Sequence, residues 1–285
     1  MEINQKDLLE IIDFALKEDI GDGDHTSIAC VPKFAKKKAK LLVKDNGILA
    51  GVELAKIIFN RVDPNLKVEV LINDGTAVEN GQIAFYVTGS SRSILTAERL
   101  VLNFMQRMSG IATKTQQLAK LIEDLPTKLL DTRKTTPCVR LMEKWAVKIG
   151  GGHNHRFALY DMIMIKDNHI DYAGGIQQAI ERVNDYLKEN NKALKIEIEV
   201  RNIDELKEVL SVGNVDRIML DNFTPQQITE ALKLIPRDKY ETEASGGINE
   251  SSIRDYALTE IDYISSGALT HSYQSLDLSL KAVDE

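Results

Sequence analysis

The spacing of apolar residues separates a first part of mixed helix and strand from a second part in which strands and helices alternate. Residues 7–18 place apolar side chains at helical spacing, and the glycine-rich segment 21–24 ends this predicted helix. From 39 to 87, short apolar runs alternate with Asn-Gly and Asp-Gly pairs, which predicts an antiparallel sheet. Residues 93–123 predict two helices that meet near Ser109 and Gly110.

After Pro126 the chain repeats a short apolar run, a polar or glycine-rich turn and a helical segment. Strands separated by roughly 20 to 35 residues with helices between them predict a parallel sheet, and their number favours an α/β barrel. The active site of such a barrel lies at the carboxyl ends of the strands. Thr224 and Pro225 fit the start of one intervening helix, as a cap and a first-turn residue. The apolar runs lie at 129–130, 162–165, 196–200, 217–220, 241–244 and 263–265.

Length and composition describe a folded protein of enzyme size. The chain has 285 residues, of which 43% are hydrophobic and 28% charged. No apolar run approaches the roughly 20 residues that span a bilayer, and the first residues lack a targeting pattern, so we expect a cytoplasmic protein that does not enter membranes. The two cysteines, Cys30 and Cys138, are far apart and suggest neither a disulfide framework nor a zinc site.

Charge is distributed unevenly along the chain. The formal net charge of -7 argues against nucleic-acid binding, which requires a basic surface. Between Asp131 and His169, however, seven lysines and arginines stand against four acids. This local excess suits a site for a small anionic ligand, although a solvated basic face explains the count equally well.

Candidate cations follow the predicted strands directly. Arg133 and Lys134 come after the run at 129–130, where a guanidinium suits carboxylate and an ammonium suits phosphate. Three glycines then precede His155 and Arg156 and allow close approach of a ligand. Lys166 follows the run at 162–165 and faces the barrel mouth, where it either binds an anion or forms a Schiff base. Ordinary loop charges remain the alternative.

Acidic and glycine-rich segments follow the later strands. In residues 196–200 (IEIEV) the alternation places Glu197 and Glu199 on one face, either inside the barrel or, as surface acids, on an edge strand. Asp221 ends the next run, and carboxylates at adjacent strand ends can hold Mg²⁺ or ribose hydroxyls. Two glycine turns, 245–247 and 265–267, suit phosphate or serve only as tight connections.

These segments, taken in order, resemble the quinolinate phosphoribosyltransferase family, also called carboxylating nicotinate-nucleotide pyrophosphorylases. The matching motifs are DTRKTTP, GGGHNHR, IKDNHI, EIEV, LDNF, ASGGI and SSGALTHS, and upstream EDIGDGDHTS is also similar. Cys138 stands where the family commonly has glycine. The resemblance implies an N-terminal α/β sandwich domain (1–111, completed by 273–285) and an incomplete, open α/β barrel of TIM-like type (112–272). It also implies a homodimer that shares its active sites.

The resemblance assigns roles to individual residues. It implies that quinolinate is bound by five residues, Arg99 of the second subunit with Arg133, His155, Arg156 and Lys166. It implies that the catalytic residues are Lys134, Glu199 and Asp221, and that Glu199 and Asp221 also hold Mg²⁺, directly or through water. The expected residues for phosphoribosyl pyrophosphate are Lys134, Glu199, Asp221, Ser245, Gly246, Gly247, Ser266 and Gly267.

Three other functions fit parts of this pattern. A phosphoribosyltransferase acting on another aromatic acid, such as nicotinate, would need fewer cations. A Schiff-base aldolase would need a buried lysine with a lowered pKa and would not need Glu199 with Asp221. A ligand sensor without activity would keep the phosphate turns but could lose these carboxylates.

Overall fold

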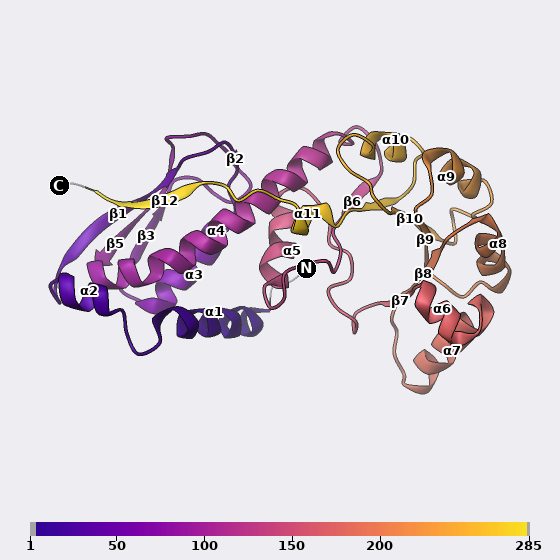
Figure 1. Cartoon of the computed structure of the whole chain (residues 1–285), viewed down its shortest axis with the longest axis horizontal. Helices are drawn as coiled ribbons and strands as arrows, with labels where there is room; N and C mark the ends of the chain where they lie inside the picture. The colour runs from indigo at the N-terminus through magenta and orange to yellow at the C-terminus, as the bar shows by residue number, and fades with distance from the viewer. Residues whose placement is uncertain (1–3, 284–285) are drawn as a thin grey trace. The chain divides into compact units, whose positions relative to one another are not determined.

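The computed structural model describes residues 4–283, which fall into two compact units (Figure 1). Unit 1 comprises the residues up to 116, residues 135–151 and those from 269 onward, whereas unit 2 comprises 117–134 and 152–268. The predicted domain ranges differ from these units mainly at 135–151, which groups with unit 1. Residues 1–3 and 284–285 of the predicted N-terminal domain lie outside the described range. No described helix is both long and apolar enough to cross a membrane.

Unit 1 contains a four-stranded antiparallel sheet in the order β12-β1-β5-β3. The last strand pairs with the first, with Leu280 opposite Leu41. The predicted first helix is confirmed as α1, and Gly21 at its end has a φ of 55°. The elements are α1 (Gln5–Ile20), α2 (His25–Cys30), β1 (Lys36–Val43), β2 (Gly47–Ile48), α3 (Val52–Val62), β3 (Lys67–Val70), β4 (Ala77–Val78), β5 (Ile83–Ser90), α4 (Ser91–Lys120), α5 (Arg140–Ile149), α11 (Ala268–His271) and β12 (Leu278–Ala282).

Helix α3 was not predicted, because the region 39–87 was interpreted as strands alone. Its apolar side chains recur at helical spacing and are buried, as Leu54, Ile58 and Phe59 show. The helix has no local side-chain cap. Instead, the carboxylate of Asp74 accepts hydrogen bonds from the backbone N–H groups of Val52 (2.8 Å) and Glu53 (3.3 Å). The signal for its start therefore lies far along the sequence.

The predicted break near Ser109 and Gly110 is wrong, because α4 is one helix of 30 residues. The Ser109 hydroxyl is buried and bonds both the N–H and the carbonyl of Ala50. At Gly110 a Cβ atom would overlap the backbone carbonyl of Gln274. Both residues are therefore small because other parts of unit 1 approach the helix closely, and not because the helix ends there.

Unit 2 is an open barrel of six parallel strands in the order β6-β11-β10-β9-β8-β7. All six predicted strands and the predicted fold class are confirmed. The cap of α9 is also confirmed, since Thr224 and Gln227 form a capping box with Pro225 in the first turn. The elements are β6 (Lys128–Leu130), β7 (Ile163–Ile165), α6 (Asp167–Ala173), α7 (Ile176–Glu189), β8 (Ile196–Val200), α8 (Ile203–Val212), β9 (Arg217–Asp221), α9 (Pro225–Leu232), β10 (Glu241–Ser245), α10 (Ile253–Ala257) and β11 (Tyr263–Ser265).

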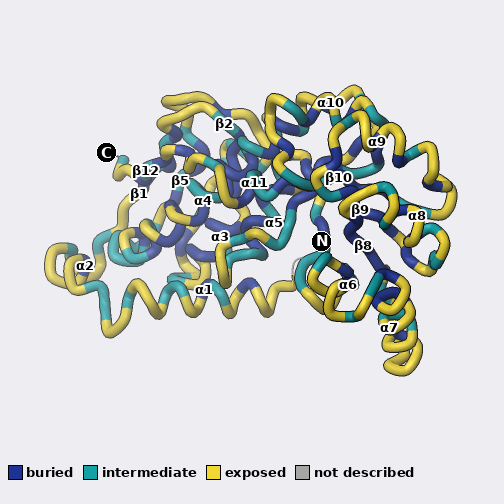
Figure 2. The backbone as a smooth tube through the Cα atoms, turned by 45° about the vertical axis from the view of Figure 1, so that its right-hand side comes forward, coloured by how far each residue is buried: buried dark blue, intermediate teal, exposed yellow. Residues whose placement is uncertain are grey.

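Strand β8 lies inside the sheet and is buried along its whole length, which Figure 2 shows in dark blue. Its two glutamates are consequently buried as well, and the interpretation of Glu197 as a surface acid on an edge strand is wrong. The edge strands of the described sheet are β6 and β7. An acidic residue in the interior of a barrel requires a nearby counter-charge.

We predict that Cys138→Gly stabilises the protein. Cys138 is exposed and has a φ of 67°, a left-handed conformation that costs an ordinary residue about 1–2 kcal/mol. Glycine also makes the unfolded chain more flexible, which offsets about 0.5–1 kcal/mol of this gain, so the free energy of unfolding should rise by at most about 1.5 kcal/mol. Urea denaturation measures this change.

The other cysteine supplies the matched control. Cys30 is also exposed but lies in the right-handed helix α2. Cys30→Gly should therefore lower the free energy of unfolding, by at most about 1 kcal/mol. Changes of the same sign in the two variants would contradict the explanation based on backbone conformation.

Candidate active site at the carboxyl ends of the parallel strands

Most site residues predicted in unit 2 lie on or directly after the carboxyl ends of its strands. This arrangement follows from the parallel sheet, in which all carboxyl ends meet on one side. His155 and Arg156 lie instead in the loop between α5 and β7, and Arg99 is exposed on α4 in unit 1. The strand-end residues are Arg133 and Lys134 after β6, Lys166 after β7, Glu199 in β8, Asp221 in β9, Ser245 in β10 and Ser266 with Gly267 after β11.

Lys166 and Glu199 form an ion pair, with 3.1 Å between Nζ and Oε2. The lysine side chain is 46% exposed, whereas the glutamate side chain is 9% exposed. A half-exposed lysine in an ion pair does not occupy the dry pocket that a Schiff-base lysine requires. His169 accepts the backbone N–H of Lys166 through Nδ1 (2.9 Å), which gives it a structural role at the start of α6.

Asp221 lies at the end of β9 with its carboxylate partly exposed. Burial raises the pKa of Asp221 above its ordinary value, while Lys166 and a hydrogen bond from Asn222 (2.6 Å) act in the opposite direction. Gly246 has a φ of 105°, and a Cβ atom there would overlap the side chain of Asn222. The glycine after β10 therefore allows the loop after β9 to take its place beside Asp221.

Asp131 organises the loop that contains His155, a role that sequence reasoning missed. Its fully buried carboxylate accepts the backbone N–H of His155 (2.8 Å) and the side-chain amide of Asn154 (2.6 Å). Backbone bonds between β6 and His153 add a short parallel bridge. The loop is thus attached to β6 like an additional strand. The available signal was the position of Asp131 immediately after an apolar run.

The glycines before this loop serve packing in addition to any ligand. At Gly150 a Cβ atom would overlap the carbonyl oxygen of Ala112, within unit 1. Gly151 has a φ of 88° and open space around its Cα. Packing therefore requires a glycine at position 150, and the close approach of a ligand to this segment stays a prediction.

His155 belongs to a buried charged cluster of four residues, which are His155, Glu197, Arg217 and Glu243. Its Nε2 atom is 2.9 Å from Glu197 Oε2 and 3.2 Å from Glu243 Oε2. Arg217 Nη1 is 3.1 Å from the same oxygen of Glu243 and 4.0 Å from that of Glu197. The side chains of both glutamates are fully buried, and that of His155 is 4% exposed.

The cluster favours a positive charge on His155. Burial alone would lower the pKa of His155, but its contacts with Glu197 and Glu243 outweigh burial and raise it to about 9. The backbone N–H of Arg156 donates to Nδ1 (2.6 Å), and this hydrogen bond acts in the opposite direction because only an unprotonated Nδ1 accepts it. Burial, followed by the charge of Glu243, raises the pKa of Glu197.

Arg156 and Arg133 provide concentrated positive charge close to His155. Burial lowers the pKa of Arg156, and the charge of Arg133 lowers it further. Arg156 also donates to the carbonyl of Met162 (3.1 Å), which fixes the guanidinium near the start of β7. Two guanidinium groups that repel one another favour the binding of an anion between them.

Glu199 and Asp221 fit a magnesium ion by the chemistry of their donor atoms. Both present carboxylate oxygens, which Mg²⁺ prefers, at the ends of adjacent strands. Burial raises the pKa of Asp221 even though the charge of Lys166 acts against it. A bound cation would further stabilise the ionised carboxylate.

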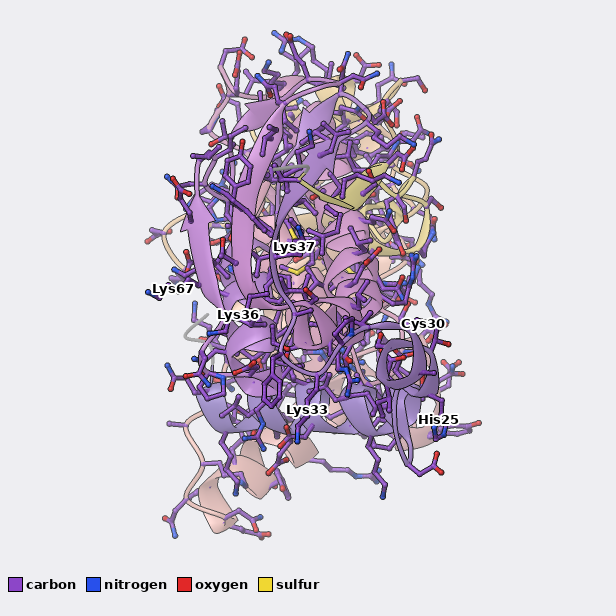
Figure 3. The ribbon with its side chains drawn as sticks, turned by 90° about the vertical axis from the view of Figure 1, so that its left-hand side faces the viewer. His25, Cys30, Lys33, Lys36, Lys37 and Lys67 are labelled. Carbon is purple, nitrogen blue, oxygen red and sulfur yellow. The ribbon has the colours of Figure 1, made fainter. Side chains whose placement is uncertain are left out.

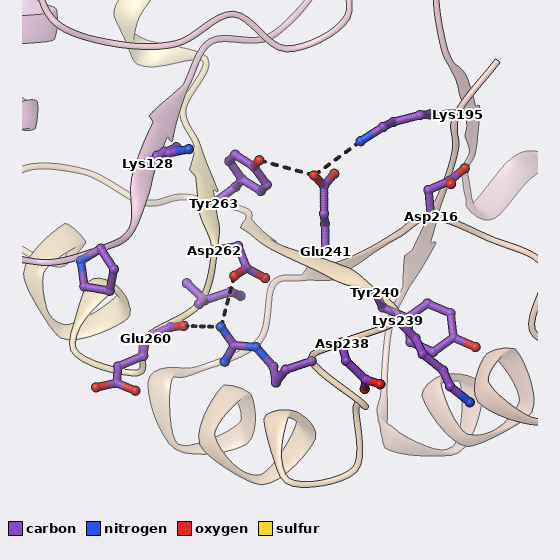
Figure 4. Close-up of a pocket in the computed structure, with 13 residues that line it drawn as sticks. Lys128, Lys195, Asp216, Asp238, Lys239, Tyr240, Glu241, Glu260, Asp262 and Tyr263 are labelled. Carbon is purple, nitrogen blue, oxygen red and sulfur yellow. Dashed lines mark hydrogen bonds and ion pairs between the residues drawn. The ribbon is translucent and has the colours of Figure 1, made fainter. Parts of the chain in front are cut away.

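A cavity of about 480 Å³ lies at the amino ends of the parallel strands, and none of the predicted site residues line it (Figure 4). Lys195 pairs with Glu241 there (3.3 Å), and the Arg217 guanidinium lies over the ring of Tyr263, 4.1 Å from the ring centre.

Unit 1 also carries a group of lysines that the charge count between Asp131 and His169 did not include. These residues are Lys33, Lys36, Lys37 and Lys67 (Figure 3).

Known proteins resemble the chain over nearly its full length. Residues 24–109 match the family model "Quinolinate phosphoribosyl transferase, N-terminal domain", and residues 111–281 match the corresponding C-terminal domain. A quinolinate phosphoribosyltransferase (decarboxylating) of Nicotiana tabacum is 46% identical, with 96% of this chain and 82% of the relative covered. A chloroplastic nicotinate-nucleotide pyrophosphorylase (carboxylating) of Arabidopsis thaliana has the same identity and coverage.

Solved structures agree with these sequence matches. The crystal structure of NadC from Streptococcus pyogenes superimposes with a TM-score of 0.91 at 38% identity, and the match covers 100% of both chains. Both domain models and these relatives lead to one conclusion: the chain belongs to the quinolinate phosphoribosyltransferase family.

Proposed function

We propose that this chain converts quinolinate and phosphoribosyl pyrophosphate to nicotinate mononucleotide, carbon dioxide and pyrophosphate in the de novo synthesis of NAD. One observation carries the proposal beyond family membership: groups of both charges occur together at the carboxyl ends of the parallel strands. Cations suited to a dicarboxylic acid come from the loops there (Arg133, Arg156 and Lys166). Carboxylates suited to a sugar and a metal come from the strands (Glu199 and Asp221).

The cations bind the two carboxylates of quinolinate. Arg133 and Arg156 supply planar donor groups that match carboxylate geometry, and Lys166 supplies a point charge held by Glu199. His155 lines the same site and is held in place by the buried cluster. Arg99 from a second copy of the chain completes the set, which its exposure on α4 permits.

Phosphoribosyl pyrophosphate binds at the adjacent strand ends. Glu199 and Asp221 accept hydrogen bonds from the ribose hydroxyls, and Lys134 approaches the phosphates. The glycine turns after the last two strands leave room for the 5-phosphate, since Gly247 has open space around its Cα. The residues of these turns are Ser245, Gly246, Gly247, Ser266 and Gly267.

The chemistry proceeds by positioning and electrostatic stabilisation. The quinolinate nitrogen attacks the anomeric carbon as the bond to pyrophosphate breaks, and Glu199 and Asp221 stabilise the positive charge that grows on the sugar. When bound, Mg²⁺ neutralises the departing pyrophosphate. The positive charge of the quaternised ring nitrogen then stabilises the electron pair that stays on the adjacent ring carbon when its carboxylate leaves as CO₂, and that carbon takes a proton from water. No protein nucleophile takes part.

The assembly and location of the enzyme belong to the same proposal. We infer a homodimer in which Arg99 enters the active site of the other copy, and a cytoplasmic enzyme that uses Mg²⁺. The Schiff-base alternative is disfavoured by the ion pair of Lys166, and the monoacid alternative by the number of cations. The carboxylates Glu199 and Asp221 disfavour a ligand sensor without activity.

The reaction is tested by mass spectrometry of the products. With phosphoribosyl pyrophosphate and Mg²⁺, we expect nicotinate mononucleotide and CO₂ from quinolinate and no product from nicotinate. Product from nicotinate alone would replace the assigned substrate with a monoacid, and no product from either acid would reject the activity.

Lys166→Ala should raise the KM for quinolinate by about tenfold or more, because a hydrogen bond to a charged group contributes about 1.5–3 kcal/mol. Lys195→Ala is the matched control, since Lys195 also pairs with a strand glutamate, Glu241, but at the amino ends of the strands. Borohydride added with substrate should trap no adduct on the wild-type enzyme. A trapped adduct would favour Schiff-base chemistry instead.

Removal of divalent cations should abolish turnover. Dialysis against EDTA should leave the fold intact by circular dichroism, and added Mg²⁺ should restore activity. Glu199→Gln and Asp221→Asn should each raise the Mg²⁺ concentration that gives half-maximal rate, because a carboxylate ligand is lost. Full activity in EDTA would reject the role of the metal.

A further inference from the structure

The buried cluster beneath His155 is built from alternating positions of three neighbouring strands. Glu197 in β8 lies opposite Arg217 in β9, and Glu243 in β10 lies opposite the next inward position of β9. The side chains converge inside the barrel, where both glutamates are fully buried. A charged group in such a place is costly unless its partners are fixed, so this arrangement demands a reason.

Two glutamates of the cluster contact the His155 ring from the interior of the barrel. His155 Nε2 lies 2.9 Å from Glu197 Oε2, whereas Arg217 Nη1 lies 4.0 Å from the same oxygen. Glu243 is shared between His155 (3.2 Å) and Arg217 (3.1 Å). Arg217 is itself held by Glu241, 2.9 Å away on its other side. The two carboxylates therefore leave the ring little freedom to rotate.

The position of the ring is coupled to that of Arg156. The backbone N–H of Arg156 donates to His155 Nδ1 (2.6 Å), and the backbone N–H of His155 donates to Asp131 (2.8 Å). The imidazole thus contacts Glu197 and Glu243 through Nε2 and accepts the backbone N–H of Arg156 through Nδ1. A rotation of the ring would displace this segment.

We propose that Glu197 and Glu243 are positioning residues for the carboxylate-binding side of the active site. They fix the His155 ring from inside the barrel, and through the ring they set the place of the Arg156 backbone. The proposal rests on the assigned reaction with quinolinate. It predicts that the two glutamates govern recognition of the aromatic acid and leave recognition of the sugar phosphate unchanged.

A metal ion is the competing occupant of this place. His155, Glu197 and Glu243 offer three ligand atoms within 4.8 Å of one another. The guanidinium of Arg217 already lies 3.1 Å from Glu243, however, and would repel a divalent cation. We therefore assign the cluster to positioning.

Steady-state kinetics of Glu197→Gln and Glu243→Gln test the proposal. Each should raise the KM for quinolinate by about tenfold while the KM for phosphoribosyl pyrophosphate changes by less than about twofold. Glu197→Asp, which keeps the charge, should recover part of the loss. An unchanged KM for quinolinate, or an equal rise for both substrates, would overturn the proposal.

Glu241→Gln is the matched control, because Glu241 lies on β10 like Glu243 and also pairs with Arg217. The carboxylate that contacts His155 from this strand is that of Glu243. It should leave both KM values unchanged. Should Glu243→Gln fail to fold in thermal melting, Glu197→Gln carries the test alone, since Glu243 then keeps both of its partners. A rise in the KM for quinolinate in Glu241→Gln equal to that in Glu197→Gln would reject the specific role of the two glutamates.

A measurement on the ring separates this proposal from the assigned reaction. In ¹⁵N NMR spectra, with the His155 signals identified from His155→Gln, the ring signals should shift in Glu197→Gln and stay in place in Glu241→Gln. This result is expected whether or not quinolinate is the substrate, and unshifted signals in Glu197→Gln would overturn the positioning. Stoichiometric zinc in the purified wild type, absent from Glu243→Gln, would show a metal site instead.

Discussion

The need to neutralise acidic side chains inside the barrel constrains the rest of the active site. Glu197 and Glu243 are removed from water by the parallel strands around them, and burial of an unpaired carboxylate is severely destabilising. His155 and Arg217 contact these acids from a loop and from the strand between the two glutamates. The same pairing that makes these acids tolerable also determines where the loop containing Arg156 lies.

Two lysines on strand ends illustrate how the fold separates structure from function. Lys166 and Lys195 each pair with a strand glutamate at similar distance, but at opposite edges of the sheet. In parallel α/β barrels the carboxyl edge carries the chemistry and the amino edge contributes to stability. Equal contacts can therefore have different significance, and direction along the strand decides which applies.

Much of unit 2 could be predicted from sequence because its signals are local. Each strand is a short apolar run, and the candidate residues directly follow these runs. Helix α3 could not be found in this way, since its cap, Asp74, comes from a distant turn. Ser109 and Gly110 resembled a break because the residues that approach them are equally remote. The pairing of Glu197 with His155 depends on tertiary structure, and alternation alone could not decide which face was buried.

The pairing of β12 with β1 has a consequence for the order of folding. Residues 278–282 pair with residues 36–43, and all six strands of unit 2 lie between these two segments in the sequence. Pairing within an unfolded chain would therefore have to close a very long loop, at a cost in conformational entropy. A folded unit 2 shortens that loop, so we expect β12 to join the edge of its sheet late in folding.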